Sequence, residues 1–502
     1  MARPSKKKTS QAKESPPLRD EEPTIVIGID FGTTYSGVAW AASGLPNRIN
    51  IITNWDAVKH HCSDKEKAPS AISYDGSGKI TWGYSIPDKE SAIEWFKLCL
   101  LDESDIPKAI RNSKRLQAAR DSLRQSDRRV VDVISDYLKK LWKHTILTIK
   151  RSIGERLVNF SRFKVVATLP AIWPVYAQIR MNEAIEKAGI LDARPAGDTT
   201  LAFLSEPEAA ALATMKDIFR YNKANMEIGD HFVVCDAGGG TVDVITYTVI
   251  QLDPLRVEES VKGDGKLCGA SFLDERFMDI LRAKLDEMSP DAWQILENSG
   301  ALSRIINVDW ENGIKTQFRN TDQHWVIQMP VNGPKRTHDE FRFSDLKFDV
   351  KEAQPIFKPV MAEISQLVID QIETVKKKYK KEPKCVILVG GFGRQPYLYT
   401  CIQVALERDI KLEGKTEVLQ SPGAEPWTAI CRGAVIRGLE LSDNTTESTV
   451  FRAKDQTSWF LRVGETVPVD KSIEKGFYYD IEQPITKLHT ALIYSISSTP
   501  SK

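Results

Sequence analysis

Two short segments of this 502-residue chain hold the residue types that bind phosphate and metal ions. Residues 24–37 read TIVIGIDFGTTYSG and residues 231–247 read HFVVCDAGGGTVDVITY, so each ends an apolar run with an aspartate and continues with glycine and threonine. Glycine lets backbone N–H groups approach a phosphate without a Cβ in the way, and threonine adds a hydroxyl donor. An aspartate at the end of a strand can hold a hydrated divalent cation. Two such segments facing each other would bind a polyphosphate from both sides.

Both segments are predicted to form hairpins, because β-branched residues resume soon after each glycine-containing turn. Gly and Asp are common in turns of every kind, so one segment alone is equally well explained as an ordinary tight hairpin. Repetition of the pattern favours the phosphate-binding interpretation. Neither segment matches GxxxxGK(S/T), which excludes a P-loop, and neither opens a helix as a dinucleotide fingerprint does.

Length and composition predict an ordinary protein of two or more domains or lobes, because 502 residues exceed one hydrophobic core. Its 41% hydrophobic and 27% charged residues are typical of a soluble globular chain. A formal net charge of +1 provides no global field for nucleic acid or an anionic membrane, and no apolar run approaches a membrane span, so neither partner is expected. The seven cysteines are scattered and odd in number, which favours reduced thiols in the cytoplasm, with the nucleus as the alternative.

The elements that must position the two turns alternate between strand and helix patterns, which predicts mixed α/β lobes. Strand patterns fall on residues 71–74, 163–170 and 385–389. Helical patterns fall on about 130–151, 176–188, 207–215, 271–285 and 360–380, with a further helix opened around Pro396. Ser271 is a candidate N-cap. Composition changes after about residue 440, where a polar linker precedes what reads as the start of a β module.

Four motifs occur in order along the chain, namely DFGTTYS, LSEPEAAALAT, DAGGGTVDV and LVGGFGRQP. Together they resemble the actin-like ATPase superfamily, and specifically the seventy-kilodalton heat-shock chaperone family. The segments ATLPAIWP and WFLRVGETVP are similar to its divergent branch of actin-like ATPase domain proteins. The resemblance runs from about residue 24 to 440 and implies an α/β, two-lobed actin-like ATPase fold with duplicated ribonuclease-H-like lobes. A short, incomplete C-terminal β segment would follow.

The resemblance also sets the expected domain boundaries. They are a disordered tail at 1–23, ATPase lobe I at 24–225, ATPase lobe II at 226–420 with an inserted subdomain at about 270–350, a crossing helix returning to lobe I at 421–440, and a linker with a truncated β module at 441–502. The last segment is too short for the peptide-binding sandwich and helical lid that the chaperones carry at this place.

Carried over to this chain, the resemblance assigns Asp30 and Asp236 to a hydrated magnesium ion, one from each lobe. The phosphate loops would comprise Gly32, Thr33, Thr34 and Tyr35 in the first lobe and Gly238, Gly239, Gly240 and Thr241 in the second. Transfer of a γ-phosphoryl group to water needs charge neutralisation and alignment more than covalent help. A cation between two carboxylates and two sets of donors would supply both.

Three further side chains match family positions around the γ-phosphate. Lys97 would reach the phosphate and the attacking water, while Glu206 and Asp243 are candidates for proton removal, with Thr241 counted among the catalytic residues. Simpler explanations exist, because a lone lysine is usually a solvated charge and an acidic residue at a helix N-terminus is favourable through the helix dipole alone. The sequence leaves the choice of base open.

Adenosine contacts are implied on lobe II. In the family, a glycine loop passes beneath the ribose, an arginine stacks on the adenine and charged residues of a nearby helix contact both. The matching residues here are Gly390, Gly391, Arg394, Glu311 and Lys315. Two positions depart from the family pattern, because Ile314 replaces a second lysine and Trp427 replaces an acidic residue after proline.

These assignments predict an ATP-binding, slowly ATP-hydrolysing, chaperone-like switch. ATP or ADP and Mg²⁺ would be its cofactors, K⁺ a further candidate ion, and an unfolded polypeptide or a co-chaperone its partner. A sugar-type kinase on the same fold, a filament-forming actin relative and a nucleotide-binding pseudo-ATPase are the alternatives. The kinase would require a carboxylate base in the cleft, for which Asp243 is the single local signature. The intact acidic and lysine positions argue against a pseudo-ATPase.

Overall fold

The computed structural model describes residues 23–441, with gaps at 58–64, 88–91, 107–110, 112, 172, 222–225, 253–254, 267, 330–344, 410–415, 422 and 424. All of these residues belong to the first of two units into which the chain divides, Met1–Thr446. The predicted N-terminal tail up to residue 22 and the predicted linker and β module from residue 442 lie outside the described residues. Among the described helices, none has an apolar stretch long enough to cross a lipid bilayer.

The first sheet is built around the first predicted hairpin. Strand β1 (Thr24–Phe31) runs antiparallel to β2 (Tyr35–Ala42) and parallel to β8 (Arg162–Leu169). β8 runs parallel to β9 (Thr200–Ser205) at one edge, which gives the order β3-β2-β1-β8-β9. The two short strands that pair with β2 are β3 (Asn50–Ile51) and β4 (Lys67–Pro69).

The second sheet repeats this topology around the second hairpin. Strand β10 (His231–Ala237) runs antiparallel to β11 (Val242–Leu252) and parallel to β15 (Cys385–Val389). The outer strands are β12 (Leu255–Lys266), antiparallel to β11, and β16 (Glu417–Gln420), parallel to β15. The order β12-β11-β10-β15-β16 therefore matches the first sheet strand for strand. This repetition confirms the predicted α/β fold with duplicated lobes.

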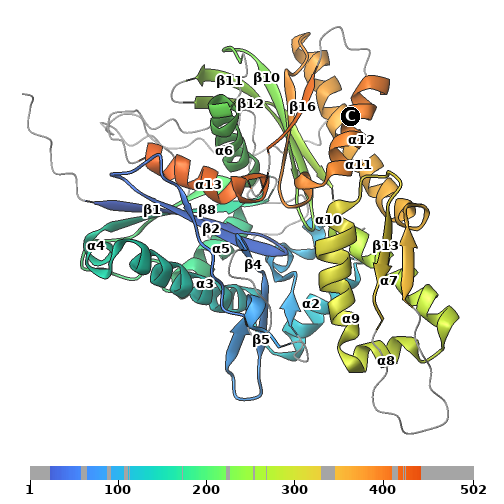
Figure 1. Ribbon diagram of the computed structural model, residues 1–502. Helices are drawn as coiled ribbons and strands as arrows, with labels where there is room; N and C mark the ends of the chain where they lie inside the picture. The colour runs from blue at the N-terminus through green and yellow to red at the C-terminus, as the bar shows by residue number, and fades with distance from the viewer. Residues whose placement is uncertain are drawn as a thin grey trace, which may run out of the picture. The chain divides into compact units, whose positions relative to one another are not determined.

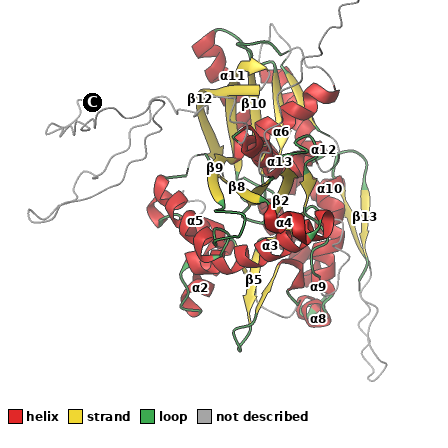
Figure 2. Ribbon diagram, turned by 90° about the vertical axis from the view of Figure 1, so that its left-hand side faces the viewer, coloured by secondary structure: helices red, strands yellow, loops and turns green. Residues whose placement is uncertain are grey.

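Two helices pack between the sheets, α6 (Glu206–Tyr221) and α13 (Glu425–Glu440), as Figures 1 and 2 show. α13 lies on β1, β2 and β8 of the first sheet, whereas α6 contacts β10 and β11 of the second sheet. Their backbones touch, because a Cβ added to Gly433 would lie 1.7 Å from the carbonyl oxygen of Ala209. The absence of a side chain at Gly433 is what permits this approach.

The outer face of each sheet is covered by other helices, and each sheet has its own hydrophobic core. On the first sheet, α3 (Val130–Ile153) and α5 (Val175–Lys187) bury residues such as Tyr137 and Met181 against β1 and β8. On the second sheet the covering helices are α7 (Ser271–Met288), α11 (Val350–Tyr379) and α12 (Pro396–Asp409).

The remaining elements are short and lie outside the two sheets. The strands are β5 (Ala71–Tyr74), β6 (Ile80–Trp82), β7 (Ile93–Glu94), β13 (His324–Ile327) and β14 (Leu346–Asp349). The α-helices are α2 (Lys114–Gln125), α4 (Glu155–Phe160), α8 (Ala292–Ser299), α9 (Ala301–Arg304) and α10 (Lys315–Gln317). The 3-10 helices are η1 (Gly83–Ser85), η2 (Phe96–Leu100), η3 (Glu103–Asp105) and η5 (Phe392–Arg394), and η4 (Ile305–Ile314) is a π-helix.

Two sequence-based expectations need correction. Ser271 is not the N-cap of α7 but its first residue, and its hydroxyl donates to the carbonyl of Gly239 at 2.6 Å, so it supports the second turn. Helix α11 begins ten residues before its predicted start at 360 because Asp349 and Glu352 form a capping box, with each side chain accepting from the other's backbone N–H. Buried apolar residues along this helix stabilise it although Pro355 and Pro359 lie inside it.

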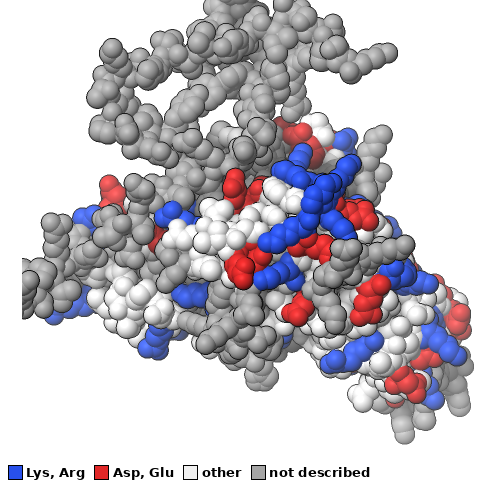
Figure 3. Space-filling model, turned by 90° about the horizontal axis from the view of Figure 1, so that it is seen from above, with Lys and Arg blue, Asp and Glu red and all other residues white. Residues whose placement is uncertain are grey.

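Charges of both signs are interspersed on the described part of the surface. Figure 3 shows Lys and Arg side chains gathered on the face seen from above, with Asp and Glu side chains beside them. After the end of α11, the ammonium groups of Lys381 and Lys384 each lie 2.7 Å from an oxygen of Asp230. Local pairing of this kind agrees with the near-zero formal net charge of the chain.

Candidate functional site

The two glycine-threonine turns contact each other. A Cβ added to Gly239 would lie 2.2 Å from Oγ1 of Thr34, and one added to Gly240 would lie 3.5 Å from Cγ2 of Thr33. The close approach at Gly239 therefore depends on the absence of a side chain there. The structure thus brings together the two turns that the sequence predicts to face each other.

Three aspartates lie on the strands that border these turns. Asp30 and Asp236 each occupy the last-but-one position of β1 and β10, and Asp243 is the register partner of Asp236 on β11. All three side chains are buried. Burial raises the pKa of the Asp236 carboxyl well above its ordinary value, and the nearby charges of Glu206 and Asp243 raise it further. Burial, again with Glu206, raises the pKa of Asp243 to about 7.

Lys97 and Glu206 form a buried ion pair beside these aspartates. The Lys97 ammonium, on η2, lies 2.5 Å from Oε1 of Glu206, the first residue of α6. The same ammonium lies 5.3 Å from the centre of the Trp173 ring, within the range of a cation–π contact. Burial raises the pKa of Glu206, and the charge of Lys97 opposes this rise. Lys97 is thus a buried, oriented cation and not a solvated surface charge.

A second lysine, Lys67, belongs to the same group although no sequence motif predicts it. Its ammonium lies 2.5 Å from Oδ2 of Asp30, and both side chains are buried. Lys67 is on β4, in a stretch with no motif of its own, so no local signal points to it. The strand register places Lys67 beside Asp30, because β4 pairs with β2 and β2 pairs with β1.

Two of the predicted adenosine residues, Glu311 and Lys315, belong to an ion-paired cluster with Asp274 on α7. The ammonium of Lys315 lies 2.8 Å from Asp274 and 2.7 Å from Glu311, and the indole of Trp310 donates to Asp274 at 2.7 Å. Arg115 from α2 approaches the same carboxylate at 3.3 Å. Asp274 was not predicted, since an acidic residue in the first turn of a helix is favourable through the dipole alone.

The predicted glycine loop at Gly390 and Gly391 passes beside Asp236. Gly390 has a φ of +84°, and a Cβ there would lie 2.5 Å from Oδ1 of Asp236, so glycine is required on both grounds. A Cβ on Gly391 would lie 3.2 Å from the indole nitrogen of Trp427. The ring of Trp427 packs edge-on against Tyr35 at 5.6 Å, and the Arg394 guanidinium lies 5.7 Å from its centre. An aromatic ring therefore lies between the first turn and the predicted glycine loop.

The donor set suits a hydrated magnesium ion better than a fully protein-coordinated metal. Within residues 23–441 as far as they are described, no group of three or more His, Cys, Asp and Glu side chains could hold a metal ion. Mg²⁺ keeps several waters and binds through one or two carboxylates. Asp30 and Asp236 supply two buried carboxylates of this kind, and the raised pKa of Asp236 reflects a charge that a cation would stabilise. The residues present therefore fit the ion.

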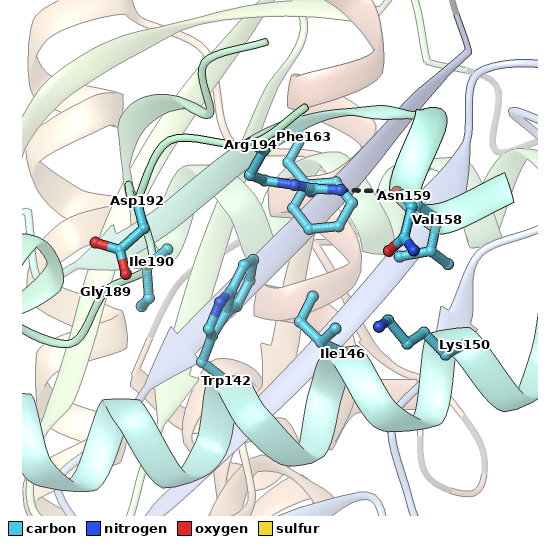
Figure 4. A pocket seen from close by; sticks show the side chains of 10 residues that line it. All are labelled: Trp142, Ile146, Lys150, Val158, Asn159, Phe163, Gly189, Ile190, Asp192 and Arg194. Atoms are coloured by element: carbon cyan, nitrogen blue, oxygen red, sulfur yellow. Dashed lines mark hydrogen bonds between the residues drawn. The ribbon is translucent and has the colours of Figure 1, made fainter. Parts of the chain in front are cut away.

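A separate cavity of about 180 Å³ lies among α3, α4 and the residues that follow α5. Figure 4 shows the Arg194 guanidinium lying against the ring of Phe163, with Trp142 on the opposite side of the cavity. Arg194 also donates to the carbonyl of Val158 at 2.7 Å. None of the predicted site residues lines this cavity.

The duplicated sheets and their two facing turns define the actin-like ATPase fold class. The family model described as Hsp70 protein matches residues 143–475, more than half of the chain. The chain therefore belongs to the Hsp70 family, which confirms the resemblance of its motifs.

Similarity to individual members is distant. Heat shock 70 kDa protein 12A of Mus musculus is 23% identical, with 83% of this chain and 69% of the relative covered. Heat shock 70 kDa protein 12B of Homo sapiens is 23% identical over 76% of this chain and 65% of its own length. Chaperone protein DnaK of Thermosipho africanus (strain TCF52B) is 24% identical over 83% of this chain and 59% of its own length. This chain is thus a divergent member of the family.

Proposed function

We propose that this protein binds ATP with magnesium between its two sheets, hydrolyses it slowly and acts as a chaperone-like switch. The observation that carries the proposal is the contact of Thr34 with Gly239, which places two donor-rich turns against each other. Buried aspartates border both turns, as a chelated polyphosphate requires. Membership of the Hsp70 family supports ATP binding and a chaperone-like role.

Each half would contribute one carboxylate and one phosphate loop. Asp30 and Asp236 would hold the hydrated magnesium ion, which neutralises phosphate charge when bound. Backbone N–H groups and threonine hydroxyls would bind the phosphate oxygens. The loop residues in these roles are Gly32, Thr33, Thr34 and Tyr35, with Gly238, Gly239, Gly240 and Thr241.

Hydrolysis would depend on Lys97, Glu206 and Asp243. The Lys97 ammonium would exchange its contact with Glu206 for one with the γ-phosphate, which would leave Glu206 able to accept a hydrogen bond from the attacking water. Asp243 is the second candidate base, because its pKa of about 7 suits proton transfer near neutral pH.

Adenosine would bind between the Gly390 loop and the helical cluster of Glu311 and Lys315. Because Lys315 already has two carboxylate partners, a ribose hydroxyl would join an existing hydrogen-bonded group. The Trp427 ring offers an aromatic surface beside Arg394.

Closure of the two halves would follow the nucleotide state. Contacts from both turns to the γ-phosphate would hold the halves together, and their loss after hydrolysis would favour a more open state. The helix pair α6 and α13, which packs between the sheets, would carry this change. We propose that the partner, an unfolded polypeptide or a co-chaperone, binds differently to the two states.

Phosphate release by the full chain tests the proposal. We expect slow release from ATP with Mg²⁺, a loss of release in EDTA, and a change in rate when a permanently unfolded polypeptide is added. ADP formation that requires a sugar and releases no free phosphate, because the phosphoryl group passes to the sugar, would instead support a sugar-type kinase. ATP binding without any turnover, measured by calorimetry and a phosphate assay, would identify a pseudo-ATPase. Absence of ATP binding would refute the proposal.

A further inference from the structure

Lys67 reaches Asp30 across an intervening strand. Asp30 on β1 is the register partner of Gly37 on β2, and Gly37 is the register partner of Lys67 on β4. The three residues therefore lie side by side across the sheet, and register partners project from the same face. Lys67, on the outer strand, places its ammonium 2.5 Å from Oδ2 of Asp30.

The middle position makes this reach feasible because it has no side chain. A Cβ on Gly37 would lie 2.9 Å from Cγ and 3.1 Å from Cε of Lys67, so the lysine stem lies directly over the glycine backbone. The Lys67 backbone is also held in place, since its carbonyl accepts a hydrogen bond from the Tyr84 hydroxyl at 3.2 Å. Lys67 is only 5% exposed, so its ammonium is directed into the site and away from solvent.

The charge of this lysine acts on the group of carboxylates as a whole. Lys97 is already paired with Glu206, whereas the ammonium of Lys67 pairs with Asp30. The charge of Lys67 also acts to lower the pKa of Asp236 and of Glu206. In a buried site such charges interact strongly, because solvent screening is weak. Without Lys67, an entering polyphosphate would meet an uncompensated Asp30 carboxylate.

We propose that Lys67 is a built-in cation of the nucleotide site, which neutralises Asp30 and so allows a nucleoside triphosphate to bind without a divalent metal ion. Lys67 and a metal ion compete for Asp30. Removal of the lysine therefore frees this carboxylate for the metal while it creates repulsion toward metal-free nucleotide. This inference rests on the proposed ATP site and adds a residue to which neither the motifs nor the family match assigns a role.

Calorimetric titration of the full chain with ATP tests the inference under two conditions, excess Mg²⁺ and EDTA. We expect Lys67→Met to weaken binding of metal-free ATP by about tenfold or more, while binding of Mg·ATP changes by less than about threefold. Lys79→Met serves as the matched control, because this lysine is exposed at a turn next to β6. It should leave both affinities unchanged.

A double variant keeps the test valid if Lys67→Met does not fold. Lys67→Met combined with Asp30→Asn removes both charges of the buried pair, so no isolated charge remains. Metal-free ATP should then bind within about threefold of the wild type, because the repulsion is gone, while Mg·ATP binds more weakly. Thermal melts report whether each variant is folded.

Several results would overturn the inference. Equal weakening under the two conditions in Lys67→Met would mean that the lysine only supports the local structure. Unchanged binding of metal-free ATP would mean that its charge does not matter. Loss of metal-free binding in the double variant would show that neutralisation of Asp30 is not the cause. A wild type that binds ATP in neither condition refutes the proposed function itself, which separates the two failures.

Discussion

The hydroxyl of Thr34 rests against Gly239, close enough that a methyl group on this glycine would lie 2.2 Å from Oγ1. Thr34 follows β1 and Gly239 follows β10, so the contact joins the turns of two separate sheets. Equivalent turns in a duplicated fold thereby meet at one place, with Asp30 and Asp236 directly before them. This geometry is the reason to look for a polyphosphate at this point.

Gly239→Ala should impair nucleotide binding, because the new Cβ must displace Thr34 or its own loop. A displaced phosphate loop loses hydrogen bonds to charged phosphate oxygens worth about 1.5–3 kcal/mol each, so we expect ATP affinity to fall by about tenfold or more. Fluorescence titration with a labelled ATP analogue measures this change.

The matched control is Gly44→Ala, at a glycine whose added Cβ would meet nothing within 4 Å. It should bind ATP as the wild type does. Wild-type affinity in Gly239→Ala would mean that the contact between the turns is irrelevant to binding.

Lys97→Ala should lower both stability and phosphate release. Glu206 would remain buried without its partner at 2.5 Å, which costs roughly 3–5 kcal/mol in comparable buried pairs. Loss of a cation directed at the γ-phosphate should slow hydrolysis by about 100-fold or more. Urea denaturation and a single-turnover phosphate assay give the two values.

Adding Glu206→Gln to Lys97→Ala separates these effects. The double variant should recover much of the lost stability because no buried charge is left unpaired, but it should not recover turnover. Rapid hydrolysis in either variant would contradict the role proposed for Lys97.

Stability without metal should fall as pH rises from about 4 to 7. The pKa of Asp243 is raised to about 7 by burial and by the charge of Glu206. An aspartate in the unfolded chain has a pKa of about 3.9. Within this window the folded state therefore binds more protons than the unfolded state, so the free energy of unfolding falls as the pH rises. The effect of this one group reaches up to about 4 kcal/mol and levels off above pH 7.

Urea midpoints in EDTA at a series of pH values measure this dependence, and Asp243→Asn should make it shallower. Glu208, whose pKa burial also raises to about 7, contributes in the same window, so Glu208→Gln serves as a comparison. An Asp243→Asn profile as steep as that of the wild type would show that Asp243 does not titrate here.

Gly433→Ala should destabilise the interface between the sheets, because the added Cβ would lie 1.7 Å from the carbonyl oxygen of Ala209. Helices α6 and α13 would have to separate, and overpacking of this kind costs about 1–3 kcal/mol or more. Thermal unfolding should show a lower midpoint than in Gly76→Ala, where the added Cβ would have open space. Equal midpoints would mean that the helices are not tightly packed in solution.

Local patterns in the chain were sufficient to predict both hairpins and the helices α3, α5, α6, α7, α11 and α12, but not α2, α4, α8, α9 or α10. The strand at Ala71–Tyr74 has the predicted bounds, and α3 and α5 begin within one residue of their predicted starts. Hydrophobic periodicity and turn residues act over a few positions, so they can be recognised from the local sequence without knowledge of distant contacts. The start of α11 lies earlier than predicted because a capping box and buried apolar residues stabilise its first turns.

Side-chain partnerships across long separations required the folded chain. Lys67 meets Asp30 across 37 residues, and Lys97 meets Glu206 across 109 residues. The first pairing depends on the register of three strands and on a missing side chain at Gly37, and neither property can be inferred from the residues around Lys67. The packing of elements that are distant in the sequence decides which charged side chains are buried together. Residue type and spacing predict only the local structure of each segment and the groups that its side chains could bind.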